Sequence, residues 1–209
     1  DQCGSRGLGD VYKRQASESL SLNKKTIVVL GDSLSAGYGV KIEQSWPSLL
    51  ENSLKKNNLG LSVINAGISG DTTSGGLFRL PLLLKKHKPK IVILELGGND
   101  GLRGMSINRV IKKNLEQMIN MIRASGSIVV MVGVELPPNY GDRYTTSFKN
   151  MYVDLADQYN ISLVKGSLVE MVSSNLMQAD GIHPNKAGHV LIEQEVLKDL
   201  MPILLNLTD

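Results

Sequence analysis

Serine and histidine are the residue types in this chain that suit nucleophilic catalysis. A serine hydroxyl is a poor nucleophile until a base removes its proton, and the usual base is an imidazole whose tautomer is held by a carboxylate. The chain has three histidines. His87 stands among lysines and His189 falls inside a predicted helix, whereas His183 occupies a loop, three residues after Asp180 and beside Pro184. The sequence therefore favours His183 as a base, with Asp180 as its carboxylate.

Three stretches rich in glycine and small polar residues follow predicted strands, at residues 31–39, 65–72 and 97–104. Glycine permits tight turns and lets the backbone approach a ligand closely. One such loop is ordinary in an α/β protein, but three in succession favour a ligand site. The first stretch contains Ser33, which is the candidate nucleophile.

Short apolar runs alternate with amphipathic stretches from Thr26 onward. Strands are predicted over residues 26–30, 61–64, 91–94, 127–134 and 161–164. Helices are predicted over residues 46–56 (with Ser45 as the cap), 73–88, 107–124, 148–159 and 185–201. This alternation predicts a parallel sheet with helices on both faces, a three-layer α/β/α architecture. Because ligands bind beyond the carboxyl ends of such strands, the loops that follow them are the place for a site.

The surroundings of Ser33 distinguish between two α/β folds. In α/β-hydrolases the nucleophile sits in a G-x-S-x-G turn and the acid and base usually come from separate loops. Here Ser33 lies in Gly-Asp-Ser-Leu-Ser, and Asp180 and His183 share one short loop. We therefore expect a flavodoxin-like five-stranded parallel sheet, with Ser33 on the loop after the first strand.

Length and composition limit the classes of protein. The 209 residues fit one domain with a sizeable core. Residues 1–25 show no periodicity and are interpreted as a disordered or non-native tail, which leaves residues 26–209 as the single domain. The net charge of +3 argues against a nucleic-acid binder. A single cysteine, Cys3, excludes an intrachain disulfide, no apolar run is long enough to span a membrane, and the dispersed histidines indicate no metal site.

Four blocks in order resemble the SGNH (GDSL) hydrolase family, especially its bacterial thioesterase and lysophospholipase members. They are Gly31-Asp-Ser-Leu34, Gly70 within residues 68–72, Gly97-Gly-Asn-Asp100 and Asp180-Gly-Ile-His183. The resemblance runs from about Thr26 to the closing helix. It is specific because four blocks occur together, whereas the first block alone would carry little weight.

The resemblance implies a serine esterase or thioesterase that works through an acyl-enzyme intermediate. Ser33 would attack the acyl carbonyl, His183 would accept and return the proton, and Asp180 would support the imidazolium. The backbone N–H groups of Ser33 and Gly70, with the side-chain amide of Asn99, would form the oxyanion hole. Expected substrates are acyl thioesters, lysophospholipids and simple carboxylic esters. We also expect no cofactor and a monomer, and the resemblance implies a periplasmic or secreted location, with a cytoplasmic one left open.

Several residues are candidates for binding substrate. Leu102 lies in a glycine-flanked loop, Leu136 and Pro137 lie on a proline-stiffened one, and Ile182 precedes the base. Together they are expected to line a groove for an acyl chain. Asp32 stands beside the nucleophile and is expected to hydrogen-bond loop backbone; it is the fifth candidate.

Alternatives remain open. A carbohydrate O-deacetylase of the same fold would use the same residues, although the apolar loops argue against it. A non-catalytic phosphate or flavin binder is the other class, because a Gly- and Ser-rich loop after the first strand can cradle phosphate. The lysines of residues 85–90 either complement a helix dipole, which is the commoner reason, or attract an anionic phospholipid or acidic carrier protein.

Overall fold

The computed structural model describes residues 25–166 and 168–207, and the side chains of residues 168 and 169 are left out of that description. The segment 1–25, predicted to be a tail, lies outside the described residues apart from Lys25, where the first strand begins. The division into a tail and one domain therefore stays a prediction.

Five parallel strands form one sheet in the order β2-β1-β3-β4-β5. The strands are β1 (Lys25–Gly31), β2 (Leu61–Asn65), β3 (Ile91–Glu95), β4 (Ile128–Val132) and β5 (Ser162–Val164). This is the flavodoxin-like order, in which β2 lies on one side of β1 and the later strands follow one another on the other side. The predicted α/β fold class and the five-stranded parallel sheet are confirmed.

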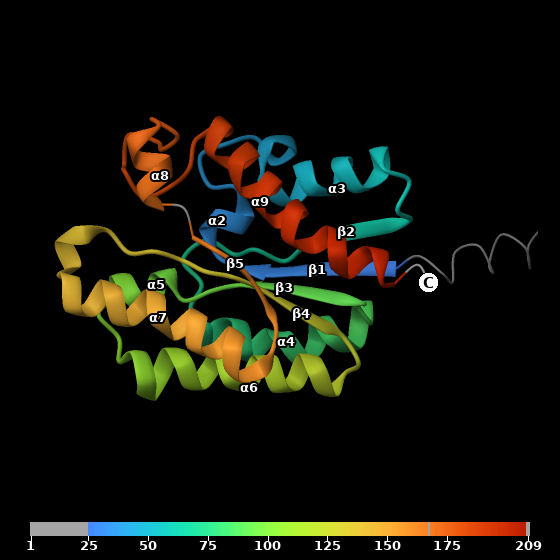
Figure 1. Ribbon diagram of the computed structural model, residues 1–209, viewed down its shortest axis with the longest axis horizontal. Helices are drawn as coiled ribbons and strands as arrows, with labels where there is room; N and C mark the ends of the chain where they lie inside the picture. Colours follow the sequence, from blue (N-terminus) through green and yellow to red (C-terminus); the bar gives the residue numbers. More distant parts are fainter. Residues whose placement is uncertain (1–24, 167, 208–209) are drawn as a thin grey trace, which may run out of the picture.

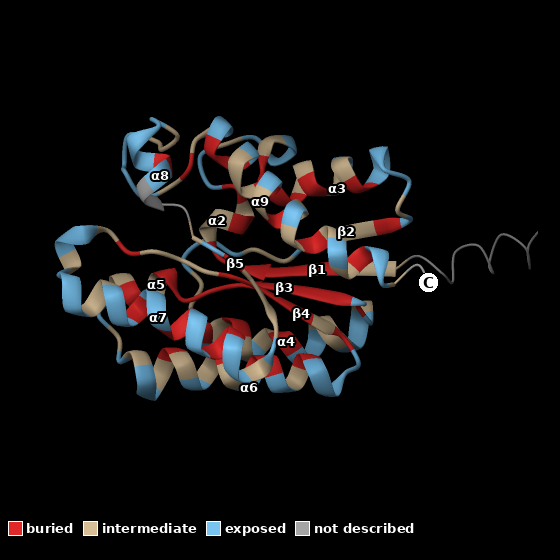
Figure 2. Cartoon of the chain, in the orientation of Figure 1, coloured by how far each residue is buried: buried red, intermediate tan, exposed pale blue. Residues whose placement is uncertain are grey.

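Helices cover both faces of the sheet, as Figure 1 shows. The long helices are α3 (Trp46–Lys56) and α9 (Lys186–Leu205) on one face, and α4 (Thr73–His87), α6 (Lys113–Ala124) and α7 (Asp142–Tyr159) on the other. Alternate residues of a strand point to opposite faces. In β1, Val28 and Leu30 accordingly join the core under α4 and α6, while Ile27 and Val29 join the core under α3 and α9. Strands β1, β3 and β4 and the inward sides of the helices are mostly buried in Figure 2, whereas the edge strands β2 and β5 are largely of intermediate burial.

The structure differs from the predicted elements in three places. The helix expected over residues 107–124 is divided into a π-helical segment, η2 (Ile107–Lys112), and α6. Helix α7 begins at Asp142 instead of residue 148, because its first residues are polar and largely exposed and so carry no apolar periodicity. Ser45 precedes α3 but does not cap it through its side chain, since its hydroxyl donates to the Ile42 carbonyl, 2.7 Å away.

Five short helical segments have no counterpart in the sequence prediction. They are α2 (Ser33–Ala36), η1 (Ile42–Gln44), α5 (Gly98–Leu102), η3 (Pro138–Tyr140) and α8 (Leu168–Ser173). Each is too short to produce a helical apolar period. Two of them, α2 and α5, follow β1 and β3 directly, so they bring Ser33 and Asn99 to the carboxyl edge of the sheet.

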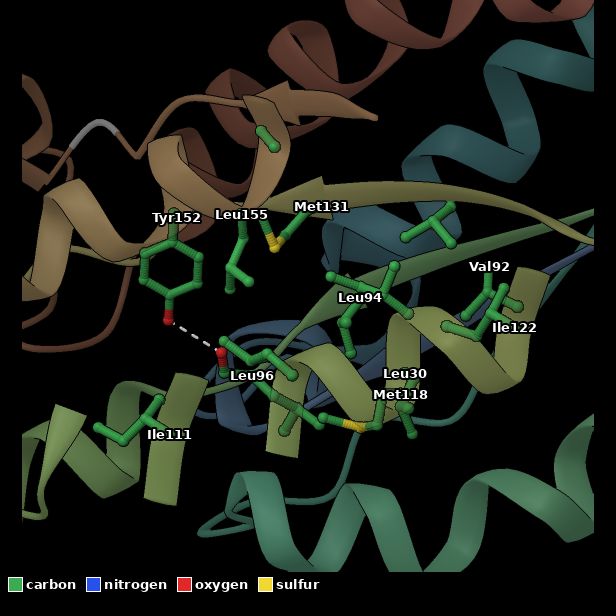
Figure 3. Close-up of a cluster of buried hydrophobic side chains, with 14 of the residues drawn as sticks. Leu30, Val92, Leu94, Leu96, Ile111, Met118, Ile122, Met131, Tyr152 and Leu155 are labelled. Carbon is green, nitrogen blue, oxygen red and sulfur yellow. Dashed lines mark hydrogen bonds between the residues drawn. The ribbon is translucent and has the colours of Figure 1, made fainter. Parts of the chain in front are cut away.

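A buried tyrosine fixes the chain where it leaves β3. The Tyr152 hydroxyl donates to the Leu96 carbonyl, 2.9 Å away, in the centre of the core drawn in Figure 3. The next residue, Gly97, has φ of 122°, and a Cβ there would lie 2.4 Å from the Tyr152 hydroxyl oxygen. Glycine is therefore required at position 97, and the turn it makes leads straight into α5 and Asn99.

We expect Tyr152→Phe to lower the free energy of unfolding by about 1–2 kcal/mol, because the Leu96 carbonyl would remain buried without a donor. Urea unfolding followed by circular dichroism measures the change. Tyr159→Phe is the matched control on the same helix, since its hydroxyl takes part only in an exposed 3.4 Å contact with Asn120. Equal stability of the two variants would contradict this account of Tyr152.

Candidate active site

Ser33 begins α2, directly after β1, and its side chain faces His183. The Ser33 Oγ lies 2.9 Å from His183 Nε2, although the two residues are 150 positions apart. Helix α2 starts here because the Asp32 carboxylate accepts the backbone N–H of Leu34, and it ends at Gly37 in the left-handed conformation. The fold thus places a hydroxyl within hydrogen-bonding distance of an imidazole.

Asp180 holds the other side of the imidazole. Its Oδ2 lies 2.7 Å from His183 Nδ1, while its Oδ1 accepts the backbone N–H groups of Ile182 and His183. These hydrogen bonds lower the pKa of Asp180 to about 2, and the bond from the His183 backbone N–H has the largest effect. The carboxylate is therefore ionised at neutral pH and orients the ring with its proton on Nδ1.

The loop that carries Asp180 and His183 is a closed hairpin ahead of α9. Asn185 N–H donates to the Leu176 carbonyl at 2.7 Å, and Gln178 N–H donates to the His183 carbonyl at 2.8 Å. The Gln178 side chain also donates to the Tyr38 carbonyl, at 2.7 Å, which ties this hairpin to the loop after α2. The base and the nucleophile are therefore linked through the backbone as well as through their side chains.

Tyr38 is a residue that sequence reasoning missed. Its ring centroid lies 4.5 Å from that of His183, and the two planes are inclined by 39°. The ring restricts the movement of the imidazole on the solvent side, since Tyr38 is about half exposed. The only signal in the sequence is its place between Gly37 and Gly39 in the first glycine-rich loop.

Asn99 lies on α5 and faces the loop of Ser33. Its Nδ2 donates to the Asp32 Oδ2 at 3.0 Å. A side-chain amide has two N–H donors, so this bond uses one and fixes the direction of the other. Asp32, which the sequence treated as a loop-bonding residue and substrate-binding candidate, is thus buried and bonded to both Leu34 and Asn99.

Gly70 lies in the loop between β2 and α4, with φ of 80°. This residue is outside the set that lines the cavity at Ser33. Its loop is nevertheless fastened to the loop of Ser33, because Arg79 donates to the carbonyls of Ala66 and Gly31 and pairs with Asp71. The role of Gly70 as an oxyanion donor stays a prediction.

A second carboxyl group, that of Glu95, is buried under Ser33. Its Oε2 accepts the Ser35 hydroxyl at 2.7 Å and the Asp32 backbone N–H at 3.3 Å, and its Oε1 has no partner within the described part of the chain. Burial raises the pKa of Glu95 well above its usual range, and the neighbouring Asp32 raises it further. Burial also raises the pKa of Asp32, to about 6. The protonated form of Glu95 is therefore favoured, which avoids two adjacent buried charges.

A cavity of about 180 Å³ opens beside Ser33. A single water needs roughly 10–15 Å³ of such space, so the cavity is large enough for part of a substrate. All five residues predicted to bind substrate line it, namely Asp32, Leu102, Leu136, Pro137 and Ile182. Further apolar lining residues come from elements that no sequence pattern places here, among them Trp46, Val164, Met171, Met177 and Ile192. Leu102 and Leu136 belong to the core under α4 and α6, whereas Trp46, Val164 and Ile192 belong to the core under α3 and α9, so the cavity lies across the edge of the sheet.

Neither a metal-ligand cluster nor a membrane-spanning helix is found in residues 25–166 and 168–207. No cluster of three or more His, Cys, Asp and Glu side chains is placed to hold a metal ion there. Likewise, none of the described helices is both long and apolar enough to cross a bilayer.

Known proteins match this chain over most of its length. The model of the GDSL-like lipase/acylhydrolase family matches residues 29–191. The chain is 45% identical to an arylesterase of Vibrio mimicus, over 90% of each chain. It is 40% identical to the thioesterase 1/protease 1/lysophospholipase L1 of Escherichia coli, over 86% of this chain and 85% of that one. The crystal structure of TesA superposes with a TM-score of 0.81 at 44% identity, covering 85% of this chain and 99% of that one. The family model matches most of the chain, and the two named relatives are 45% and 40% identical over 90% and 86% of it. The chain therefore belongs to the GDSL-like lipase/acylhydrolase family.

Proposed function

We propose that the chain is a serine hydrolase of carboxylic esters and thioesters, with Ser33 as nucleophile, His183 as base and Asp180 as its supporting carboxylate. The observation that carries the proposal is the continuous contact from Ser33 to His183 to Asp180, at 2.9 and 2.7 Å, beside an apolar cavity. Membership of an acylhydrolase family with arylesterase and thioesterase relatives supports the reaction type.

In the proposed mechanism His183 Nε2 takes the proton of the Ser33 hydroxyl as its oxygen attacks the acyl carbon. The tetrahedral intermediate collapses when the protonated His183 donates that proton to the leaving alcohol or thiol, which leaves the acyl group on Ser33. Water then attacks the acyl-enzyme, with His183 as base again, and the acid departs. Asp180 stays ionised throughout and stabilises the imidazolium.

The developing oxyanion requires donors that are already in position. We assign this role to the backbone N–H groups of Ser33 and Gly70 and to the side-chain N–H of Asn99 that is not bonded to Asp32. Asp32 then acts as a positioning residue, because its carboxylate accepts the other Asn99 hydrogen at 3.0 Å. Removing one oxyanion donor costs on the order of 10²–10³ in rate in comparable sites.

The cavity supports esters with an apolar acyl chain as substrates. Its walls are mostly apolar, with Leu102, Leu136, Pro137 and Ile182 near the catalytic residues. Aryl and alkyl esters, acyl thioesters and lysophospholipids all present such a chain, and relatives named arylesterase and thioesterase/lysophospholipase are 45% and 40% identical to this chain over most of its length. A carbohydrate O-deacetylase would be expected to offer more hydrogen-bonding groups in these walls.

Location and assembly follow from the family resemblance. We propose that the protein acts as a monomer on small-molecule substrates, without nucleic acid, and that it is exported to the periplasm or beyond. Fractionation of cells that produce the protein from its native gene measures the location.

Ser33→Ala is expected to lower kcat/KM for p-nitrophenyl esters, acyl-CoA and lysophospholipids by at least ~10⁴-fold, because no hydroxyl remains to attack. A fluorophosphonate probe should label the unaltered protein once, and this variant not at all, by intact-protein mass spectrometry. Ser35→Ala is the matched control on the same short helix and should keep the label at Ser33. Labelling of Ser33→Ala at another residue would sink the assignment.

Leu102→Asp is expected to reduce the preference for octanoyl over acetyl esters by ~10-fold or more. Each buried methylene is worth about 0.8 kcal/mol, or roughly fourfold, and a carboxylate in the wall disfavours the longer chain. Initial rates across a series of p-nitrophenyl esters measure the effect. Val153→Asp, at an exposed position on α7, is the control. An unchanged preference would place the acyl chain elsewhere.

Asp32→Asn is expected to stabilise the fold at neutral pH while it lowers activity. The pKa of Asp32 is raised from 3.8 to about 6, so the folded protein binds this proton more tightly than the unfolded chain does. Stability of the unaltered protein therefore falls as pH rises from about 4 through 6, whereas the amide does not titrate. The gain for the variant approaches about 3 kcal/mol above pH 7 and vanishes below pH 4.

Urea unfolding at both ends of this pH range tests the stability, and ester hydrolysis tests the loss of a carboxylate acceptor for Asn99. Asp154→Asn, at an exposed position in the middle of α7, is the control and should change neither quantity. If Asp32→Asn were no more stable than the unaltered protein above pH 7, the inference that a buried charge at Asp32 destabilises the fold would be wrong.

A further inference from the structure

The outward face of α4 is unusually apolar. Its exposed residues recur at helical spacing and form one stripe, which consists of Ser74, Phe78, Pro81, Leu82, Lys85 and Lys86. Phe78 is 89% exposed and Leu82 is 68% exposed, one turn apart. The opposite face of the helix is buried through Thr73, Gly76 and Leu80. The buried face of the helix therefore packs against the sheet. The apolar spacing of the sequence places Phe78 on the opposite face, which points to solvent.

Single exposed apolar residues are common and need no explanation. The stripe differs because Phe78, Pro81 and Leu82 adjoin one another and are followed by a concentrated positive charge. Residues 72–90 contain no Asp or Glu, while Arg79, Lys85, Lys86, Lys88 and Lys90 all lie within them. The four lysines exceed what is needed to complement the C-terminus of a single helix, which acts only within the last turn.

The positive charge extends from α4 to α6, the neighbouring helix of the same layer. Residues 72–124 carry ten Lys and Arg but only three Asp and Glu, and two of those acids, Glu95 and Asp100, are buried. Because the entire chain has a net charge of only +3, the remainder is net negative. Helix α6 lies beside α4 in Figure 1, and Asn114 donates to the side chains of Thr73 and Ser74. Exposed Lys113 and Arg109 therefore belong to this same face.

We propose that the apolar stripe of α4 (Phe78, Pro81 and Leu82), together with its lysine-rich end (Lys85 to Lys90), docks the protein on an anionic phospholipid surface. Apolar side chains enter the boundary between headgroups and acyl chains, while lysines attract anionic headgroups. A second copy of the chain is a poorer partner, because pairing two such faces would bring two sets of lysines together. An anionic bilayer offers acyl chains to the apolar side chains and negatively charged headgroups to the lysines.

The position of the stripe relates it to the catalytic residues. Helix α4 begins at Thr73, three residues after Gly70, and Phe78 lies five residues further on, roughly 7.5 Å along the helix axis. Arg79, the neighbour of Phe78, fastens the Gly70 loop to the loop of Ser33. A docked lipid surface would thus lie close to the edge of the sheet where the cavity opens. Docking does not depend on the proposed hydrolysis, and the two can be tested separately.

Co-sedimentation with vesicles tests the proposal. We expect the protein to bind vesicles of phosphatidylcholine mixed with phosphatidylglycerol ~10-fold more tightly than vesicles of phosphatidylcholine alone. Added salt should weaken the binding, because it screens exposed charges. Absence of binding to the mixed vesicles, or equal binding to both kinds, would overturn the proposal.

Paired variants locate the surface. Phe78→Ser/Leu82→Ser and Lys85→Glu/Lys86→Glu should each weaken binding to mixed vesicles by ~10-fold or more. The matched controls are Ile42→Ser, at a 77% exposed position on η1, and Lys56→Glu/Lys198→Glu, on the layer of α3 and α9. These controls should bind as the unaltered protein does. Equal losses in variants and controls would show that the stripe is not the docking surface.

Two further measurements separate the remaining outcomes. Size-exclusion chromatography with light scattering, without lipid, would overturn the proposal if the unaltered protein were a dimer and Phe78→Ser/Leu82→Ser a monomer, since the stripe would then be a self-interface. Hydrolysis of a short, soluble ester should be unchanged in all these variants, which shows that they fold. Vesicle binding by a protein that hydrolyses no ester would contradict the proposed function and leave the docking surface intact.

Discussion

The contact between Ser33 and His183 is the constraint that the rest of the fold must satisfy, because it joins the loop after the first strand to the loop before the last helix. For it to form, α9 must return beside β1, and it does so by packing Val196, Leu200 and Leu204 into the core that also contains Ile27 and Val29. His189 secures this return, since its Nδ1 accepts the backbone N–H of Trp46 at the start of α3, 3.3 Å away. Burial lowers the pKa of His189 to about 4, so this histidine is neutral and structural while His183 remains at the surface of the cavity.

The two aspartates of the site have opposite environments, and their environments divide the roles between them. Asp180 is partly exposed and accepts three hydrogen bonds, which keep it ionised at any pH the protein normally meets. Asp32 is buried beside Glu95, where a negative charge is costly. A charge at position 32 is maintained against that cost only because it accepts the Leu34 and Asn99 donors. This is the expected pattern for a functional site, which gives up stability locally to hold a polar group in place.

The sequence predicted the strands and the long helices because their apolar residues recur at periods of two or 3.6, and a period can be read without knowing the fold. It also identified His183, because the other two histidines stand in unsuitable positions, and Ser33, because it lies in the Gly31-Asp-Ser-Leu34 motif. Both inferences are possible because catalytic chemistry restricts residue types. The sequence did not predict α2, α5 and α8, which are too short to show a period. The contacts of Asp32 with Asn99, and of Tyr38 with His183, join segments far apart in the chain, so no local pattern reveals them. The same holds for Met171, Met177 and Ile192, which reach the cavity only through the arrangement of α8 and α9.

The reaction is specified more sharply than the substrate, and the structure gives the physical reason. Ser33, His183, Asp180 and Asn99 are held by directional hydrogen bonds, so a small displacement of any one would break a contact. The cavity walls are apolar, and apolar contacts depend on area instead of direction. A wall of this kind can contact acyl chains of different length and leaving groups of different chemistry, since no directional bond is broken when the chain changes and each methylene changes binding by only about 0.8 kcal/mol. Relatives that share this architecture bear names as different as arylesterase and thioesterase/lysophospholipase, which is the breadth expected when polar groups fix the bond to be cleaved and apolar walls contact the rest.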